Sequence, residues 1–137
     1  MRQPSSPPRR QQLRVFVLDG YEPALRGLRD QLESGGFDVV GTSLSARAAP
    51  GMILALHPDV AVLALRLQDG SGLEVLHALH AADRSVHCLM LDTFRDDKNL
   101  RAAKAGGANG YILKEIDGSV LGEALHRVAA GEFLFAA

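Results

Sequence analysis

Five short apolar runs alternate with segments of helical periodicity along most of the chain, and this alternation limits the possible folds more than any other feature. The runs cover residues 15–18, 37–40, 60–65, 86–91 and 110–113. Strands that alternate with helices usually pair in parallel, because each helix carries the chain back to the same end of the sheet. The third and fourth runs are almost entirely apolar, as in strands that helices cover on both faces. The sequence therefore predicts an α/β fold.

The segments between these runs have recognisable helix ends. We expect helices over residues 22–34, 44–56, 72–82, 96–105 and 118–130. Pro23 suits the first turn of a helix, where its missing N–H is not needed, and Gly35 and Gly36 favour termination. Right-handed crossovers leave few arrangements for five strands and five helices. An open doubly wound sheet is the leading one.

Length and charge indicate one domain without a general affinity for polyanions. The chain has 137 residues, of which 15 are Lys or Arg and 16 are Asp or Glu. This balance gives no electrostatic case for binding nucleic acid or a membrane surface. We expect a disordered tail over residues 1–12, the domain over 13–132, and a C-terminal end or the start of a linker over 133–137. Because no apolar segment is long enough for a signal peptide or a membrane span, we also expect a cytoplasmic protein.

Polar residues follow several predicted strands at the edge where open α/β sheets bind their ligands. The residues at these strand ends are Asp19, Gly20, Ala64, Asp92, Thr93 and Lys114. Two carboxylates and one ammonium group are therefore expected to converge on one crevice.

Four segments carry a resemblance to a known family. They cover residues 14–19, 58–63, 69–75 and 105–114, and the last is the most specific, because a glycine-rich turn, Tyr111 and Lys114 follow one another at the family's spacing. Over residues 14–132 the chain resembles the receiver domains of bacterial two-component response regulators. Glu115, where many receivers have proline, points to the NarL/FixJ type. The resemblance implies a three-layer, flavodoxin-like fold with five parallel strands in the order 2-1-3-4-5, and a non-enzymatic role in signal transduction.

The residues of the family's phosphorylation site are only partly present. In such domains an acidic pair after the first strand holds Mg²⁺, and an aspartate at the end of the third strand accepts the phosphoryl group. A Ser or Thr after the fourth strand and a lysine after the fifth then bind that group. Asp19 and Lys114 match this pattern, whereas Gly20, Ala64 and Asp92 stand at the second acidic position, the acceptor position and the hydroxyl position. The resemblance thus implies a degenerate pocket with weak or absent Mg²⁺ binding and no cofactor.

Thr93 could occupy the position of the family's Ser or Thr only if the register of the fourth strand were shifted by one residue. Such a shift would turn the apolar residues 89–91 to the wrong face of the sheet, so we assign Asp92 to that position. We hypothesise that Lys114 forms an ion pair with Asp92, Asp19 or both, in place of the metal and phosphate charges. Tyr111 matches the family's aromatic switch. Because Asp92 removes the usual coupling of this residue to a hydroxyl, two interpretations of Tyr111 remain open. It is either a static, half-buried strand residue or a retained switch.

The predicted function is that of an atypical, phosphorylation-independent receiver domain that regulates through protein contacts. The resemblance implies a homodimer or a partner protein, bound through the fourth helix, fifth strand and fifth helix or through the first and fifth helices. Binding to DNA would need a helix-turn-helix domain that these residues lack. The chain is then either part of a longer transcriptional regulator or a stand-alone receiver. The alternative is a small-molecule sensor or an adaptor that uses the crevice vacated at Gly20 and Ala64.

Other reactive side chains have simpler interpretations. Asp59 and Asp69 lie away from the strand ends and are weak candidates for phosphorylation. His77 and His80 lie three residues apart on a predicted helix, but no further ligands with convincing spacing accompany them, so we expect no metal site. Cys88, the single cysteine, is expected to be a small core residue and rules out an internal disulfide.

Overall fold

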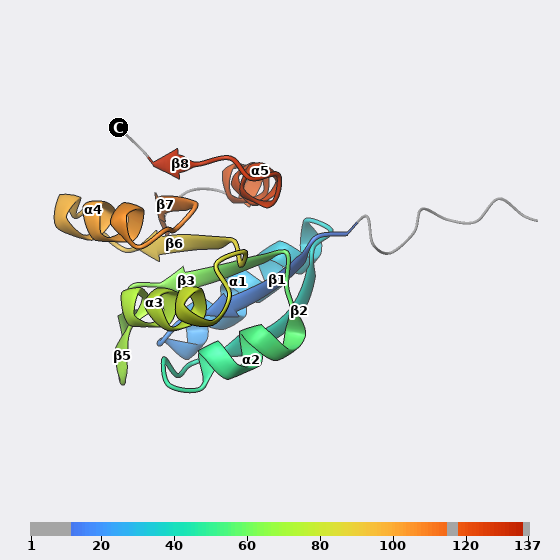
Figure 1. Cartoon of the computed structure of the whole chain (residues 1–137). Coiled ribbons are helices and arrows are strands. Elements are labelled where there is room, and N and C mark those ends of the chain that lie inside the picture. The colour runs from blue at the N-terminus through green and yellow to red at the C-terminus, as the bar shows by residue number, and fades with distance from the viewer. Residues whose placement is uncertain (1–11, 115–117, 136–137) are drawn as a thin grey trace, which may run out of the picture.

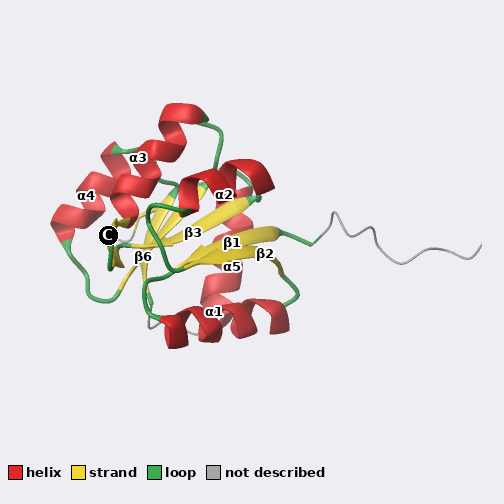
Figure 2. Cartoon of the chain, turned by 90° about the horizontal axis from the view of Figure 1, so that it is seen from below, coloured by secondary structure: helices red, strands yellow, loops and turns green. Residues whose placement is uncertain are grey.

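The computed structural model describes residues 12–114 and 118–135, which form a sheet between two layers of helices (Figures 1 and 2). The main sheet contains β1 (Arg14–Leu18), β2 (Asp38–Ser43), β3 (Val60–Ala64), β6 (Cys88–Asp92), β7 (Gly110–Leu113) and β8 (Leu134–Phe135). A small antiparallel hairpin consists of β4 (Arg66–Leu67) and β5 (Gly70–Ser71). The helices are α1 (Glu22–Ser34), α2 (Ala49–Leu56), α3 (Gly72–Ala82), α4 (Asp97–Ala105) and α5 (Gly118–Ala129). The α/β prediction is confirmed. The tail predicted over residues 1–12 lies outside the described residues except for Gln12, and so does Glu115.

The strands of the main sheet are parallel and follow the order β2-β1-β3-β6-β7-β8. The first five of these correspond to the predicted order 2-1-3-4-5, so the doubly wound topology is confirmed. All residues of β3 and β6 are buried, as their continuous apolar sequences predict. The carboxyl ends of β1, β3, β6 and β7 consequently meet at one edge of the sheet.

A sixth strand, β8, extends the sheet beyond the expected five. The backbone N–H of Leu134 donates to the carbonyl of Asn109 at 2.8 Å, and Phe135 pairs with Tyr111 in the parallel register. The chain turns out of α5 at Gly131, whose φ of 93° suits a residue without a side chain. The apolar residues 134 and 135, expected to lie in a terminal or linker segment, therefore belong to the sheet.

Two apolar clusters fill the space on the two faces of the sheet. On one face, Phe16, Leu63 and Met90 contact residues of α2, α3 and α4, and on the other face Val17, Val62 and Leu91 contact residues of α1 and α5. Figure 2 shows α2, α3 and α4 on one side of the strands and α1 on the opposite side. Successive side chains of a strand point to opposite faces, so the even and odd positions of each strand supply different clusters.

Local hydrogen bonds determine where several helices begin. The side chain of Ser71 accepts from Leu73 N at 3.0 Å while Glu74 accepts from Ser71 N at 2.9 Å, which forms a capping box at the start of α3. Helix α2 begins at Ala49, not at residue 44 as expected. The preceding residues instead bond to Asp69, with Ala46 N and Ser45 Oγ both 2.7 Å from its carboxylate.

None of the helices within residues 12–114 and 118–135 has both the length and the apolar character needed to cross a membrane.

Candidate functional site

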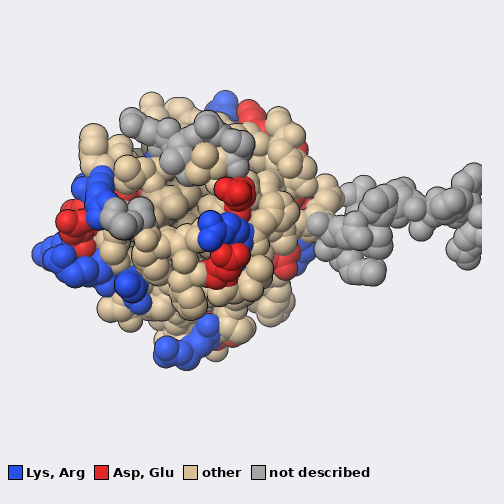
Figure 3. All heavy atoms as spheres, turned by 90° about the horizontal axis from the view of Figure 1, so that it is seen from above, with Lys and Arg blue, Asp and Glu red and all other residues tan. Residues whose placement is uncertain are grey.

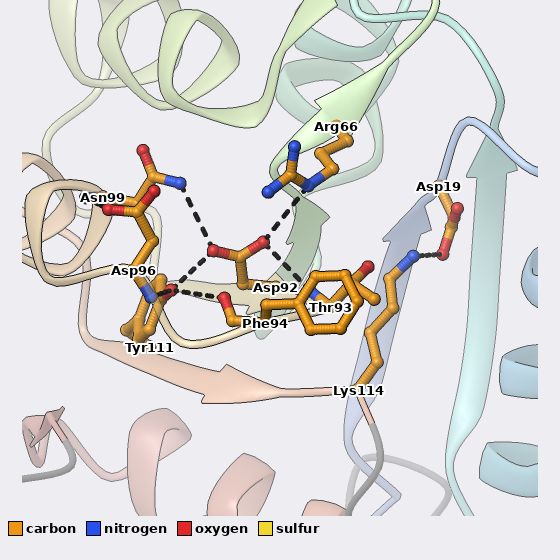
Figure 4. Close-up of polar contacts among 9 residues, drawn as sticks. All are labelled: Asp19, Arg66, Asp92, Thr93, Phe94, Asp96, Asn99, Tyr111 and Lys114. Carbon is orange, nitrogen blue, oxygen red and sulfur yellow. Dashed lines mark hydrogen bonds and ion pairs between the residues drawn. The ribbon is translucent and has the colours of Figure 1, made fainter.

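The strand ends that carry the predicted side chains lie at one edge of the sheet, where Asp19 meets Lys114 and Asp92 has other partners (Figure 4). Asp19 follows β1, Ala64 ends β3, Asp92 ends β6 and Lys114 follows β7. Lys114 N donates to the backbone carbonyl of Asp92 at 2.8 Å, so β6 and β7 remain paired up to their ends. Asp19 and Asp92 are both 1% exposed, an unusual burial for carboxylates, which normally requires compensating partners.

Asp19 is compensated by Lys114. The Nζ atom of Lys114 lies 2.7 Å from Oδ2 of Asp19, and the Lys114 side chain is 23% exposed. The other carboxylate oxygen of Asp19 accepts from Tyr21 N at 3.0 Å. This ion pair is one of the two that the sequence suggested.

Asp92 has different partners from the one expected. Its Oδ2 accepts from the Tyr111 hydroxyl at 2.5 Å and from Asn99 Nδ2 at 3.3 Å. Its Oδ1 accepts from Thr93 N at 2.9 Å, and Arg66 Nε lies 3.8 Å away. An ion pair between Lys114 and Asp92 is therefore not formed. The physical reason is direction, because Asp92 points toward α4 whereas Lys114 extends toward β1 (Figure 4).

Tyr111 is fully buried, at 1% exposure, not half-buried as one interpretation of the sequence had it. Its hydroxyl also accepts from Asp96 N at 3.0 Å, and Asp96 is the residue that caps the N-terminus of α4. Burial, together with the hydrogen bond to Asp92, raises the pKa of Tyr111 from 10.0 to about 12. One phenol thus connects the end of β6 with the start of α4.

The hairpin of β4 and β5 occupies the space next to Gly20. A Cβ atom at position 20 would lie 3.0 Å from Leu67 Cα and 3.2 Å from the carbonyl oxygen of Arg66. These distances are tighter than nine in ten real Cβ contacts, so a larger residue would require the hairpin backbone to shift by a few tenths of an ångström. The absence of a side chain at Gly20 therefore leaves no free volume there, contrary to the expectation of a vacated crevice.

Asp69 fastens this hairpin to the segment before α2. Besides Ser45 and Ala46, the amide of Arg47 donates to it at 3.1 Å. These hydrogen bonds, led by the one from Ala46 N, lower the pKa of Asp69 to about 2. Its carboxylate is thus used in holding a loop.

The contacts of His77 and His80, the two possible ligands on α3, do not indicate metal binding. His77 is exposed, whereas the two ring nitrogens of His80 lie 3.2 Å from the carbonyl oxygen of Gly106 and 3.0 Å from that of Val86. Within residues 12–114 and 118–135, no three His, Cys, Asp or Glu side chains are grouped so that they could hold a metal ion. Cys88 is buried in β6, and burial raises the pKa of its thiol to about 12, so it belongs to the core as expected.

Comparison with known proteins relates this fold and site to one family. Residues 15–126 match the family model described as the response regulator receiver domain. The chain belongs to this family. Among curated proteins it is 38% identical over 123 residues to the DNA-binding transcriptional activator DevR/DosR of Mycobacterium tuberculosis, and 32% identical over 124 residues to the nitrate/nitrite response regulator protein homolog of Haemophilus influenzae.

These matches cover 89% of the chain but only 57% and 59% of the two relatives, so the chain spans less than two thirds of their length. Among solved structures, the receiver domain of the NarL regulator from Mycobacterium tuberculosis is 28% identical, with a TM-score of 0.83 over 88% of this chain and 98% of that one. A LuxR-family regulator from Aurantimonas shares the fold, with a TM-score of 0.85 over 90% of this chain and 89% of that one at 24% identity. The resemblance noted from the sequence is confirmed.

Three contributors to the site were not predicted as such. Arg66 comes from the short hairpin, while Asn99 and Asp96 come from the start of α4. An aspartate before a helical segment is a recognisable N-cap signal, so Asp96 could have been found from its position. The sequence places Arg66 just after the third strand, at the same edge as Asp92, but its contact with Asp92 depends on how the hairpin folds back.

Proposed function

We propose that this receiver domain works without phosphorylation and regulates through protein contacts, without enzymatic activity. The observation that carries the proposal is Ala64, whose methyl group stands at the carboxyl end of β3, fully buried. In the family this position holds the carboxylate that accepts the phosphoryl group, and a methyl group has no nucleophilic oxygen. Asp59 is a poor substitute, because its carboxylate already accepts from Arg14 N at 2.8 Å. Asp69 is engaged by the loop before α2.

The residues at the strand ends also do not fit a bound Mg²⁺ ion. This cation prefers six oxygen ligands and is usually held by more than one carboxylate or by a carboxylate and a phosphate. Gly20 and Ala64 supply no carboxylate, and Asp19 Oδ2 is already neutralised by the Lys114 ammonium at 2.7 Å. The Lys114–Asp19 pair therefore substitutes for the metal in balancing the buried charge of Asp19.

The network around Asp92 supports a permanently set conformation. In the family, the aromatic residue at the position of Tyr111 moves inward when the hydroxyl after the fourth strand binds the phosphoryl group. In this chain the Tyr111 side chain is inside, and its hydroxyl donates to the carboxylate of Asp92. We infer that Asp92 holds Tyr111 inward without any phosphoryl group, and that the surface around α4 keeps one arrangement.

The output of such a domain is contact with other proteins, including a second copy of itself, in the cytoplasm. The faces formed by α4, β7 and α5 or by α1 and α5 are the two candidate interfaces. One relative is described as a DNA-binding transcriptional activator, and this chain spans 57% of its length. We therefore assign any DNA contact to a segment other than the receiver domain, within a longer transcriptional regulator.

Beryllofluoride with Mg²⁺, a mimic of the phosphoryl group, tests the proposal directly. The purified protein is titrated while amide chemical shifts are followed by NMR, with a receiver domain that retains the acceptor aspartate as the control for the reagent. We expect no saturable shift at Tyr111, Lys114 or the strand ends. A saturable shift centred on Asp19 and Lys114 would show that the pocket still binds a phosphoryl-like group and would overturn the proposal.

A further inference from the structure

Helix α4 carries three exposed cations, Lys98, Arg101 and Lys104, and one exposed carboxylate, Asp97, which pairs with Arg95 in the loop before the helix. Ion pairs within the chain engage cations on other helices, as in Arg26–Glu22 and Arg29–Glu33 on α1. By contrast, no ion pair involves Lys98, Arg101 or Lys104 in the part of the chain that the structure describes. The positive charge of this helix is therefore available to a partner, although the formal net charge of the whole chain is -1.

These three side chains lie on the outward side of the helix. They follow one another at intervals of three residues, and Ala103, on the opposite side, is completely buried. Over six residues a helix rises by about 9 Å, so the cations form a short row. At the end of the molecule where Figure 1 places α4, Figure 3 shows several Lys and Arg side chains with Asp or Glu side chains among them.

An exposed aromatic side chain lies in the loop that leads into α4. Phe94, in the loop before α4, is 68% exposed, although a phenylalanine gains most when it is buried. At the other end of the row, the Lys104 ammonium lies 5.7 Å from the centre of the Phe135 ring. We call Phe94, Lys98, Arg101 and Lys104 the α4 face. Protein-binding surfaces are enriched in aromatic residues and Arg, and this face offers Phe94 and Arg101 for such contacts.

The start of this helix is held in place by the network around Asp92. Asp96 caps α4 by accepting from Lys98 N at 2.9 Å and Asn99 N at 3.2 Å, and its own amide donates to the Tyr111 hydroxyl. Asn99 reaches back to Asp92. A surface held in one arrangement loses little conformational entropy on binding, which favours its use as a docking site.

We propose that the α4 face binds an acidic segment of a partner protein, with carboxylates about one helical turn apart and an apolar side chain that covers Phe94. This proposal rests on the proposed function, since it names the partner of a surface that no phosphoryl group rearranges. Nucleic acid fits less well, because three cations neutralise few phosphates and Phe94 would remain uncovered. Two α4 faces in direct contact would place cations opposite cations, which costs affinity.

A synthetic peptide that alternates glutamate with leucine serves as the probe. The full chain is titrated with it, and amide shifts are followed by NMR at low and at physiological salt. The test variant combines Lys98→Gln and Arg101→Gln, and the matched control combines Arg47→Gln and Arg84→Gln, which remove the same charge from exposed positions outside both candidate interfaces. Circular dichroism verifies that both variants are folded.

We expect shifts centred on α4 that weaken with salt, and a Kd raised about tenfold by the α4 variant but unchanged in the control. Phe94→Ala should also weaken binding. Equal weakening in the α4 variant and the control variant would overturn the proposal, as would preferential binding of a DNA duplex or a self-association that the α4 variant abolishes. The peptide titration uses no phosphoryl mimic, so a negative result would not contradict the proposed independence from phosphorylation. Conversely, a response to beryllofluoride would not change how the peptide titration is interpreted.

Discussion

The Tyr111 hydroxyl donates a 2.5 Å hydrogen bond to Asp92 Oδ2 and accepts one from Asp96 N at 3.0 Å. This single group joins the last residue of β6 to the residue that caps α4. Of the two hydrogen bonds, the one to Asp92 is the shorter, and bonds to a carboxylate are stronger than bonds between neutral groups. The position of α4 therefore depends on a contact buried inside the domain.

Removal of this hydroxyl should destabilise the fold. Tyr111→Phe leaves the buried Asp92 carboxylate without its nearest donor, and we expect the free energy of unfolding to fall by about 1–3 kcal/mol in a denaturant titration. Tyr21→Phe is the control, since Tyr21 is 66% exposed, and it should change stability by less than about 0.5 kcal/mol. Equal effects of the two substitutions would contradict the role assigned to the Tyr111 hydroxyl.

The ionisation of Tyr111 should be visible by spectroscopy. The chain has two tyrosines, so Tyr21→Phe leaves Tyr111 as the only phenol, and its absorbance can be titrated with pH. Its pKa of about 12 in the folded state exceeds the ordinary value of 10.0. The stability linked to this group is therefore complete below pH 10 and is lost as the pH rises through about 12. A midpoint at the ordinary value in the folded protein would refute the prediction.

The two cations at the strand ends should differ in importance. Lys114→Met leaves the buried carboxylate of Asp19 unpaired, and we expect a loss of about 3–5 kcal/mol, toward the lower end because the Lys114 side chain is partly exposed. Arg66 is 65% exposed and lies 3.8 Å from Asp92, so Arg66→Met should cost less than about 1 kcal/mol.

A second substitution identifies the cause of the Lys114 effect. Adding Asp19→Asn to Lys114→Met removes the unpaired charge and should recover part of the lost stability, as a double-mutant cycle would show. If the double variant were less stable than Lys114→Met alone by the full cost of Asp19→Asn, the ion pair would have no energetic role.

The packing of the hairpin against Gly20 can be tested with an alanine. Gly20→Ala places a Cβ 3.0 Å from Leu67 Cα and should cost about 1–3 kcal/mol. Gly27, inside α1, has no atom within 4 Å of an added Cβ, so Gly27→Ala should raise stability by about 0.5–1 kcal/mol. Thermal unfolding of both variants decides the matter, and a stabilising Gly20→Ala would show that the hairpin does not occupy this space.

The layers of the fold could be predicted from the sequence, because periodicity records which face of each element is buried. β3 and β6 read as continuous apolar runs and are buried at every position. The convergence of Asp19 and Lys114 could also be predicted, since the ends of parallel strands share one edge. β8 escaped prediction because two residues, Leu134 and Phe135, are too few to show a period.

The partner of Asp92 could not be predicted in the same way. The sequence position of Asp92 places it at the carboxyl end of β6, as expected. Which cation or hydroxyl it contacts, however, depends on the direction in which its side chain leaves the sheet. That direction puts it beside Tyr111 and Asn99 and away from Lys114. Gly20 posed a similar difficulty, because an absent side chain suggests a hole until the course of the neighbouring backbone is known.

In the proposed function, the contact between Tyr111 and Asp92 holds the conformation that a phosphoryl group sets in other receivers. The two devices differ in how long they last. An acyl phosphate hydrolyses, so a phosphorylated receiver returns to its resting state after a characteristic time. The carboxylate of Asp92 is encoded in the polypeptide and has no such clock. A regulator built on this domain would adjust its output through the amount of protein synthesised or degraded, or through competition for its binding surface, and its response would persist for as long as the molecule itself.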